Sequence, residues 1–145
     1  MPRLGRSMSP VVSRPFFKEE FPSTFEEMTA VLDHAVDALL ADGWVQAGQV
    51  PCTRLCLEEA LVNAVRHGNN SEATRQVTLT MLARGDECVI QVRDEGGEFS
   101  VDNIAMPECD QLGGRGICLI RHYMDSVTFD AEAHCLEMSF RRKAC

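Results

Sequence analysis

Residues 58–68 read Glu-Glu-Ala-Leu-Val-Asn-Ala-Val-Arg-His-Gly, and this stretch carries the strongest signal for the fold. Within it, Glu59, Asn63 and His67 are spaced four apart, so on a helix of about 3.6 residues per turn they form one polar stripe. The neighbouring face of the helix is apolar and consists of Leu57, Ala60, Leu61, Ala64 and Val65. A carboxylate, an amide and an imidazole on one face of a half-buried helix indicate a site.

The bulk composition is that of a soluble globular protein. A length of 145 residues, 45% hydrophobic and 25% charged, predicts one domain over 11–145 after a loose tail at 1–10. The net charge of −8 argues against non-specific binding to nucleic acid, whose phosphates need Lys and Arg. We see neither a signal peptide nor the roughly 20 apolar residues of a membrane span, so we expect a cytoplasmic protein with no membrane partner.

Seven cysteines are many for this length. The number is odd and no Cys-x-x-Cys occurs; Cys52 and Cys56 are four apart, but no second pair stands at zinc-ligand spacing. We expect reduced, mostly buried thiols rather than a metal site or disulfides.

Hydrophobic periodicity predicts an α+β fold. The predicted strands are 11–17, 76–83, 88–93, 127–129 and 136–140, and the predicted helices are 24–43, 52–67 and 115–124. Ser23 or Thr24 is expected to cap the first helix, and Gly68 to end the second as its C′ residue. This order predicts a two-layer α/β sandwich, with the helices packed on one face of a mainly antiparallel sheet.

Two further segments bear on function. Asp94 ends a buried-looking strand and precedes Gly96-Gly97, so its carboxylate could accept from an exocyclic amine while the glycines let a flat ring approach. After a loop at 95–112, of a length typical of lids and binding loops, Gly113-Gly114-Arg115-Gly116 opens a helix, where backbone N–H groups favour phosphate. In isolation, the first segment is equally compatible with a polar turn, and the second with a loop that ends in a helix.

The polar stripe suits nucleotide chemistry. The side-chain oxygen of Asn63 can be offered to Mg²⁺, and Glu59 can take a proton from an attacking hydroxyl. Glu58 points about 100° away and is the weaker candidate. The alternative is a solvated helix face, with His67 as a charge at the helix C-terminus.

Taken in order, these segments resemble the GHKL ATPase superfamily with its Bergerat ATP-binding fold, and most closely its anti-sigma-factor serine kinases. The resemblance runs from about Phe21 to Phe140 and is most specific at 58–68 and at 113–127. It implies that Asn63 ligates Mg²⁺, that Glu59 is the catalytic base and that Asp94 binds the adenine amine.

The resemblance also implies roles for the glycines and for the lid. Gly96 would give the base room, with Gly97 beside it. Gly114 and Gly116 would wrap the phosphates, Arg115 would contact them, and Gly113 would belong to the same cofactor-binding segment. His67 would lie near the phosphates or the lid at 98–112. The chain departs from the family pattern at Glu98, which replaces a glycine, and at Ala133-His134-Cys135, which replaces a Gly-Thr pair that would supply a hydroxyl near adenine.

The implied function is an ATP–Mg²⁺-dependent serine/threonine kinase with anti-sigma behaviour. Its partners would be a STAS-type anti-anti-sigma protein and a sigma factor, and such proteins are typically homodimers. One alternative is a nucleotide-binding switch that sequesters a partner with negligible turnover. Another is a histidine-kinase catalytic domain; the only histidine of the first predicted helix, His34, fits a core or surface residue better than a phosphoacceptor.

Overall fold

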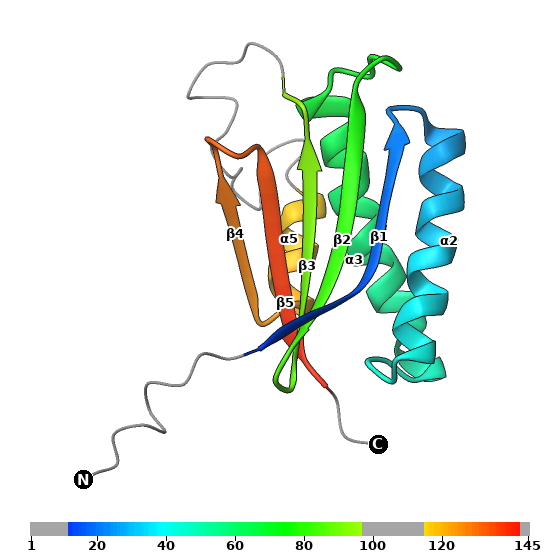
Figure 1. The fold of residues 1–145 in the computed structure, drawn as a ribbon, viewed down its shortest axis with the longest axis vertical. Coiled ribbons are helices and arrows are strands. Elements are labelled where there is room, and N and C mark those ends of the chain that lie inside the picture. Colours follow the sequence, from blue (N-terminus) through cyan, green and yellow to red (C-terminus); the bar gives the residue numbers. More distant parts are fainter. Residues whose placement is uncertain (1–11, 97–114, 143–145) are drawn as a thin grey trace, which may run out of the picture.

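The fold is a single antiparallel sheet with helices packed on one face (Figure 1). The computed structural model describes residues 12–96 and 115–142, and of 115–118 only the backbone. Within these residues the sheet has five strands in the order β1-β2-β3-β5-β4, and every neighbouring pair is antiparallel. The predicted α+β class is confirmed, whereas the predicted tail at 1–10 lies outside the described residues.

The predicted elements are present, with small differences at their ends. The strands are β1 (Ser13–Pro22), β2 (Gln76–Arg84), β3 (Glu87–Asp94), β4 (Ser126–Asp130) and β5 (Cys135–Arg141). The helical segments are α2 (Phe25–Ala41), the 3₁₀ turn η1 (Ala47–Gln49), α3 (Val50–Val62), the π-helical turn η2 (Asn63–Gly68) and α5 (Arg115–Tyr123). None of the described helices is long and apolar enough to cross a membrane.

The first strand is longer than predicted, because its pairing with β2 continues through a charged stretch as far as Pro22. It is an edge strand, and its register shifts between Pro15 and Phe17. An edge position and a bulge are the places where a residue without an N–H is tolerated in a sheet.

The central strands direct one row of side chains into the core. Val77, Leu79 and Met81 of β2 are fully buried and pair across to β3, whose inward row ends at Asp94. Side chains alternate along a strand, so Asp94 points toward the helices like the apolar residues before it. The sheet therefore carries a carboxylate at the end of its apolar face.

The two hydroxyl side chains just before α2, those of Ser23 and Thr24, have different roles. Thr24 is the N-cap, because its Oγ1 accepts from the Glu27 N–H at 3.3 Å. Ser23 is buried instead, and its Oγ donates to the Arg75 carbonyl at 2.7 Å. The chain entering α2 is thus tied to the residue that precedes β2.

Candidate functional site

The helix that carries the polar stripe changes its winding within the stripe. It is α-helical as far as Val62 and then widens into the π-helical turn Asn63–Gly68, in which the Asn69 N–H donates to the Ala64 carbonyl at 2.8 Å. π-helical turns of this kind occur frequently at functional sites.

The prediction that Gly68 ends this helix as a C′ residue was wrong. Gly68 belongs to the helical turn, the cap residue is Asn69, and the left-handed conformation falls on Asn70 and Ser71, both at φ 55°. The glycine is required for a different reason, because a Cβ at position 68 would collide with the carboxylate of Asp94. The end of the helix and the end of β3 therefore meet at this glycine.

Asp94 is a buried acid with an open acceptor. The residue is 9% exposed, and its Oδ1 is buried without a hydrogen bond from any of the described residues. Burial raises the pKa of Asp94, while the Gly96 amide and the charges of His134 and Arg75 act in the opposite direction. A buried carboxylate oxygen without a donor is the group expected to receive one from a ligand.

In the loop after β3, the His134 ring packs closely against the backbone at Gly96. Gly96 is in the left-handed conformation, at φ +67°, and the His134 ring lies where its Cβ would be. Any residue with a side chain would be strained here and would also strike the imidazole. The missing side chain at Gly68 thus leaves room for the Asp94 carboxylate, and the missing side chain at Gly96 leaves room for the His134 ring.

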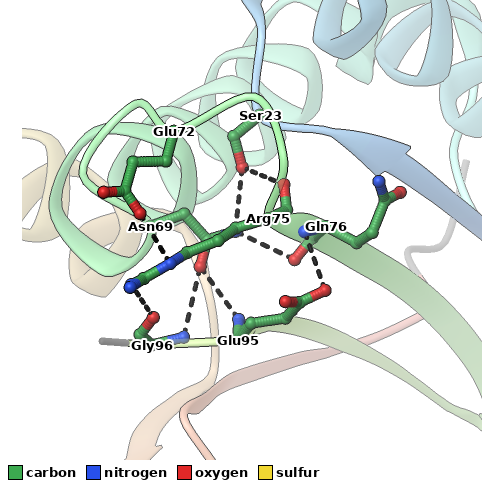
Figure 2. A network of polar contacts seen from close by, with 7 residues as sticks. All are labelled: Ser23, Asn69, Glu72, Arg75, Gln76, Glu95 and Gly96. Atoms are coloured by element: carbon green, nitrogen blue, oxygen red, sulfur yellow. Dashed lines mark hydrogen bonds and ion pairs between the residues drawn. The ribbon is translucent and has the colours of Figure 1, made fainter. Parts of the chain in front are cut away.

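The buried amide of Asn69 holds this loop in place (Figure 2). Its Oδ1 accepts from the backbone N–H groups of Glu95 at 2.9 Å and Gly96 at 3.2 Å. Its Nδ2 donates to the Ser23 Oγ at 2.8 Å and to the Gln76 carbonyl at 2.9 Å. One side chain therefore joins the helix end, the start of α2, the start of β2 and the loop after Asp94.

Arg75 reinforces the same connection (Figure 2). Its guanidinium donates to the Gly96 carbonyl and pairs with Glu72 at 2.7 Å. In addition, the Glu95 carboxylate accepts from the Gln76 N–H at 2.9 Å. The loop is thus bound through both its backbone and its side chains.

Of the remaining predicted site residues, the structure describes some and leaves others outside its described ranges. Glu59 and Asn63 are half-buried on α3 and at the first residue of η2, whereas His67 is exposed. The backbone of α5 begins at Arg115, as predicted for Arg115 and Gly116. The predicted roles of Gly97, Gly113 and Gly114 and the lid at 98–112 fall outside the described residues.

Comparison with known proteins identifies the family. The family model for the histidine kinase-like ATPase domain matches residues 21–140. The chain belongs to this family. The predicted GHKL membership is confirmed, and an ATPase domain of this kind implies that the chain binds ATP.

Two relatives of this histidine kinase-like ATPase carry names that describe a function. The anti-sigma F factor of Oceanobacillus iheyensis is 32% identical over 78 residues, which are 49% of this chain and 53% of that protein. The serine/threonine-protein kinase BtrW of Bordetella bronchiseptica is 27% identical over 116 residues, 71% of this chain and 81% of that protein. The first match therefore spans about half the length of the relative.

Sequence reasoning missed three members of the site. Asn69 and Arg75 stand between the predicted helix at 52–67 and the predicted strand at 76–83, where no site residue was expected, and His134 was noted only as a departure from the family pattern. Nothing local distinguishes Asn69 from Asn70, although one is buried and the other exposed. The signal in the sequence that could have found Asn69 and Arg75 is the cluster of polar residues directly after the predicted helix that carries Glu59 and Asn63.

Proposed function

We propose that this chain is an ATP–Mg²⁺-dependent serine/threonine protein kinase that acts as an anti-sigma factor and phosphorylates a STAS-type anti-anti-sigma partner. The observation that carries the nucleotide assignment is the buried Oδ1 of Asp94, which has no donor within 12–96 and 115–142 and whose carboxylate packs against Gly68. The names of the two relatives support the kinase and anti-sigma roles. We further propose a cytoplasmic homodimer in which 11–145 form the single domain.

At the adenine end of the proposed site, adenine is recognised by hydrogen bonding. Asp94 accepts from the exocyclic amine through its Oδ1, while Gly68 makes room for the carboxylate and Gly96 for the neighbouring His134 ring. The Asn69 amide fixes the loop before the nucleotide arrives, so little ordering has to accompany binding.

The phosphate end combines an amide oxygen with a helix N-terminus. Mg²⁺ would be held by the side-chain oxygen of Asn63 together with phosphates and water, which are oxygen ligands of the kind this cation prefers. When bound, Mg²⁺ neutralises part of the phosphate charge. Arg115 and Gly116 at the start of α5, with Gly114 before them in the sequence, would hold the phosphates, and Gly97, Gly113 and His67 would be neighbours.

Glu59 is the proposed base. It lies one turn before Asn63 on α3, where a serine hydroxyl brought to the γ-phosphate would be within reach of its carboxylate. Transfer then depends on positioning, because little covalent chemistry is required of the protein.

Incubation with labelled ATP, Mg²⁺ and a STAS-domain protein from the same genome tests the proposal. We expect label on a serine of the partner, loss of transfer in Glu59→Ala and retention in the matched variant Glu58→Ala. Tight ATP binding without transfer would overturn the kinase and favour the nucleotide-gated switch. Equal transfer by both variants would remove Glu59 from the chemistry.

A further inference from the structure

The two edges of the sheet differ in how well they are protected against further pairing. β1 and β4 are the outer strands, at opposite edges of the sheet (Figure 1). β1 carries a proline, Pro15, a register shift beside it and the exposed charge of Lys18, all of which discourage another strand from pairing there. β4 reads Ser-Val-Thr-Phe-Asp and contains no proline, glycine, lysine or arginine. None of the described strands pairs with its outer side, so β4 offers a template for a strand of another chain.

The apolar side chains of β4 are incompletely covered. Val127 and Phe129 pack against the core from the helix-facing side of the sheet, opposite Met138 and Leu136 of β5. Met138 and Leu136 are buried, whereas Val127 and Phe129 are only half-buried. A further strand beside β4 would remove this remaining apolar surface from water, which is favourable.

The sequence of β4 complements itself. When two copies pair antiparallel about a two-fold axis at Thr128, Thr128 lies opposite its own counterpart and all five residues of β4 are paired. Val127 then lies opposite Phe129 of the other copy, and Ser126 opposite Asp130. Threonine pairs, and pairs of an aromatic with a β-branched side chain, are favourable across antiparallel strands. The helix-facing apolar row of one sheet would thus continue into that of the other.

The charges at the two ends of β4 are complementary in this arrangement. Arg121 is exposed in the last turn of α5, which leads into the start of β4, and Glu132 is exposed in the turn at the other end (Figure 1). Neither side chain forms an ion pair with a described residue. The Asp125 carboxylate at the first end accepts from the Arg141 N–H at 2.8 Å. Antiparallel pairing brings the Arg121 end of each copy beside the Glu132 end of the other, twice by symmetry.

We propose that β4 is the surface through which two copies of this chain associate, as a two-fold antiparallel pair centred on Thr128. The pair would join two five-stranded sheets into one, with the helices of both copies on the same face. Backbone N–H and C=O groups on the outer side of β4 supply the hydrogen bonds, and the charged ends favour the antiparallel register. The inference rests on the homodimer proposed above and adds its surface.

Sedimentation equilibrium of the full chain over a concentration series measures the dimer Kd. Thr128→Lys would set two ammonium groups opposite each other at the two-fold axis, so we expect a Kd about tenfold weaker than that of wild type. Thr29→Lys is the matched control, because Thr29 is an exposed threonine of α2, which lies beside β1 at the other edge of the sheet (Figure 1). Its Kd should equal that of wild type.

A charge exchange tests the ends of the pair. Arg121→Glu alone should weaken the dimer about three- to tenfold, and adding Glu132→Arg to the same chain should restore most of the loss. A double variant no tighter than Arg121→Glu would overturn the contact between these ends and the register with it.

Oxidative cross-linking tests the register directly and also serves if Thr128→Lys unfolds more readily than wild type. Residues directly opposite in an antiparallel pair have Cα atoms about 4.5–5.5 Å apart, a separation that a disulfide spans, so Thr128→Cys should give a disulfide-linked dimer. Ser126→Cys is the control, because the two Ser126 positions lie four residues apart along the paired strands, roughly 13 Å, and should not be linked. Wild type gives the background from the seven native cysteines, and peptide mapping identifies the linked position.

The outcomes separate this inference from the proposal on which it rests. A wild type that stays monomeric at every concentration would overturn the homodimer and the inference with it. A dimer that is unaffected by Thr128→Lys, or that Thr128→Cys does not cross-link above background, would overturn the β4 surface and leave the homodimer standing. Phosphoryl transfer to a STAS-domain protein is measured separately and depends on neither result.

Discussion

The carboxylate of Asp94 lies in the space that a side chain on Gly68 would occupy. Gly68 closes the π-helical turn after α3, and Asp94 ends β3, so this contact fixes the distance between the helix layer and the sheet at the proposed site. The family-specific stretch at 58–68 and the Asp-x-Gly segment are therefore one structural unit, and Gly68 joins them.

Replacing Gly68 with alanine should disturb both stability and binding. The added methyl must displace the Asp94 carboxylate, and overpacking of this kind costs about 1–3 kcal/mol of unfolding free energy. We expect urea unfolding to show that loss and ATP affinity to fall. Gly48→Ala is the matched control, because a Cβ at Gly48 meets no atom within 4 Å. A Gly68→Ala protein as stable and as tightly binding as wild type would contradict the packing described.

Replacing Asp94 with asparagine should weaken ATP binding. A hydrogen bond to a charged group contributes about 1.5–3 kcal/mol, so its loss corresponds to a roughly tenfold to hundredfold weaker Kd. Titration calorimetry at pH 8 measures this, with the exposed Asp37→Asn as a control of the same chemistry. An unchanged Kd in Asp94→Asn would remove Asp94 from the adenine contact.

The same substitution should stabilise the fold above the acid range. Burial raises the pKa of Asp94 above 3.8, so the folded protein holds a proton that the unfolded chain releases. This group therefore contributes stability at a pH below the pKa that Asp94 has in the unfolded chain. That stability is lost as the pH rises through the pKa that Asp94 has in the folded protein. Near pH 7 Asp94→Asn should therefore unfold at higher urea than wild type, and a lower midpoint would contradict this sign.

The regular part of the fold could be predicted because its cause is local. Alternation of Val77, Leu79 and Met81 indicates both a strand and its buried face, and the structure buries all three. The ends of strands were less predictable. Pairing with β2 extends β1 to Pro22 through the charged residues 18–20, and no local alternation of apolar residues indicates this.

The site was harder to predict because its contacts are not local. Asp94 lies buried at the end of β3, as its sequence context indicated, but the partners of Asn69 come from positions 23, 76, 95 and 96. No pattern around Asn69 specifies them. The π-helical turn likewise leaves the hydrophobic periodicity of 58–68 unchanged, so sequence spacing predicted an ordinary helix.

Removing the amide of Asn69 should loosen the whole loop. Asn69→Ala leaves buried donors and acceptors unpaired, and the expected loss of unfolding free energy is roughly 2–4 kcal/mol. Urea unfolding measures it, and the exposed Thr74→Ala from the same turn serves as a control. Asn69→Asp keeps the acceptor for the Glu95 and Gly96 amides but turns a buried carboxylate oxygen toward the Gln76 carbonyl, so a loss at least as large as that of Asn69→Ala is expected. A loss no larger than that of Thr74→Ala would contradict the central role of Asn69.

The described cysteines should react in order of burial. Burial raises the pKa of Cys56 to about 11 and that of Cys88 to about 12, so neither supplies much thiolate at neutral pH. Cys52 is exposed. Peptide mapping after brief iodoacetamide treatment at pH 7.5 should find Cys52 alkylated well before Cys56, Cys88 and Cys135. Equal labelling of Cys52 and Cys88 in the folded protein would show that the core opens on the time scale of the reaction.

Replacing Asn63 with alanine should separate metal-dependent from metal-independent binding. If the amide oxygen of Asn63 holds Mg²⁺ beside the phosphates, Asn63→Ala should reduce ATP affinity in Mg²⁺ and leave the affinity in EDTA nearly unchanged. Titrations of wild type and variant under both conditions give the comparison. Asn70→Gly is the control, because Asn70 is an exposed amide in a left-handed conformation that glycine adopts without strain. Equal losses with and without Mg²⁺ would show that Asn63 supports the pocket structurally and holds no metal.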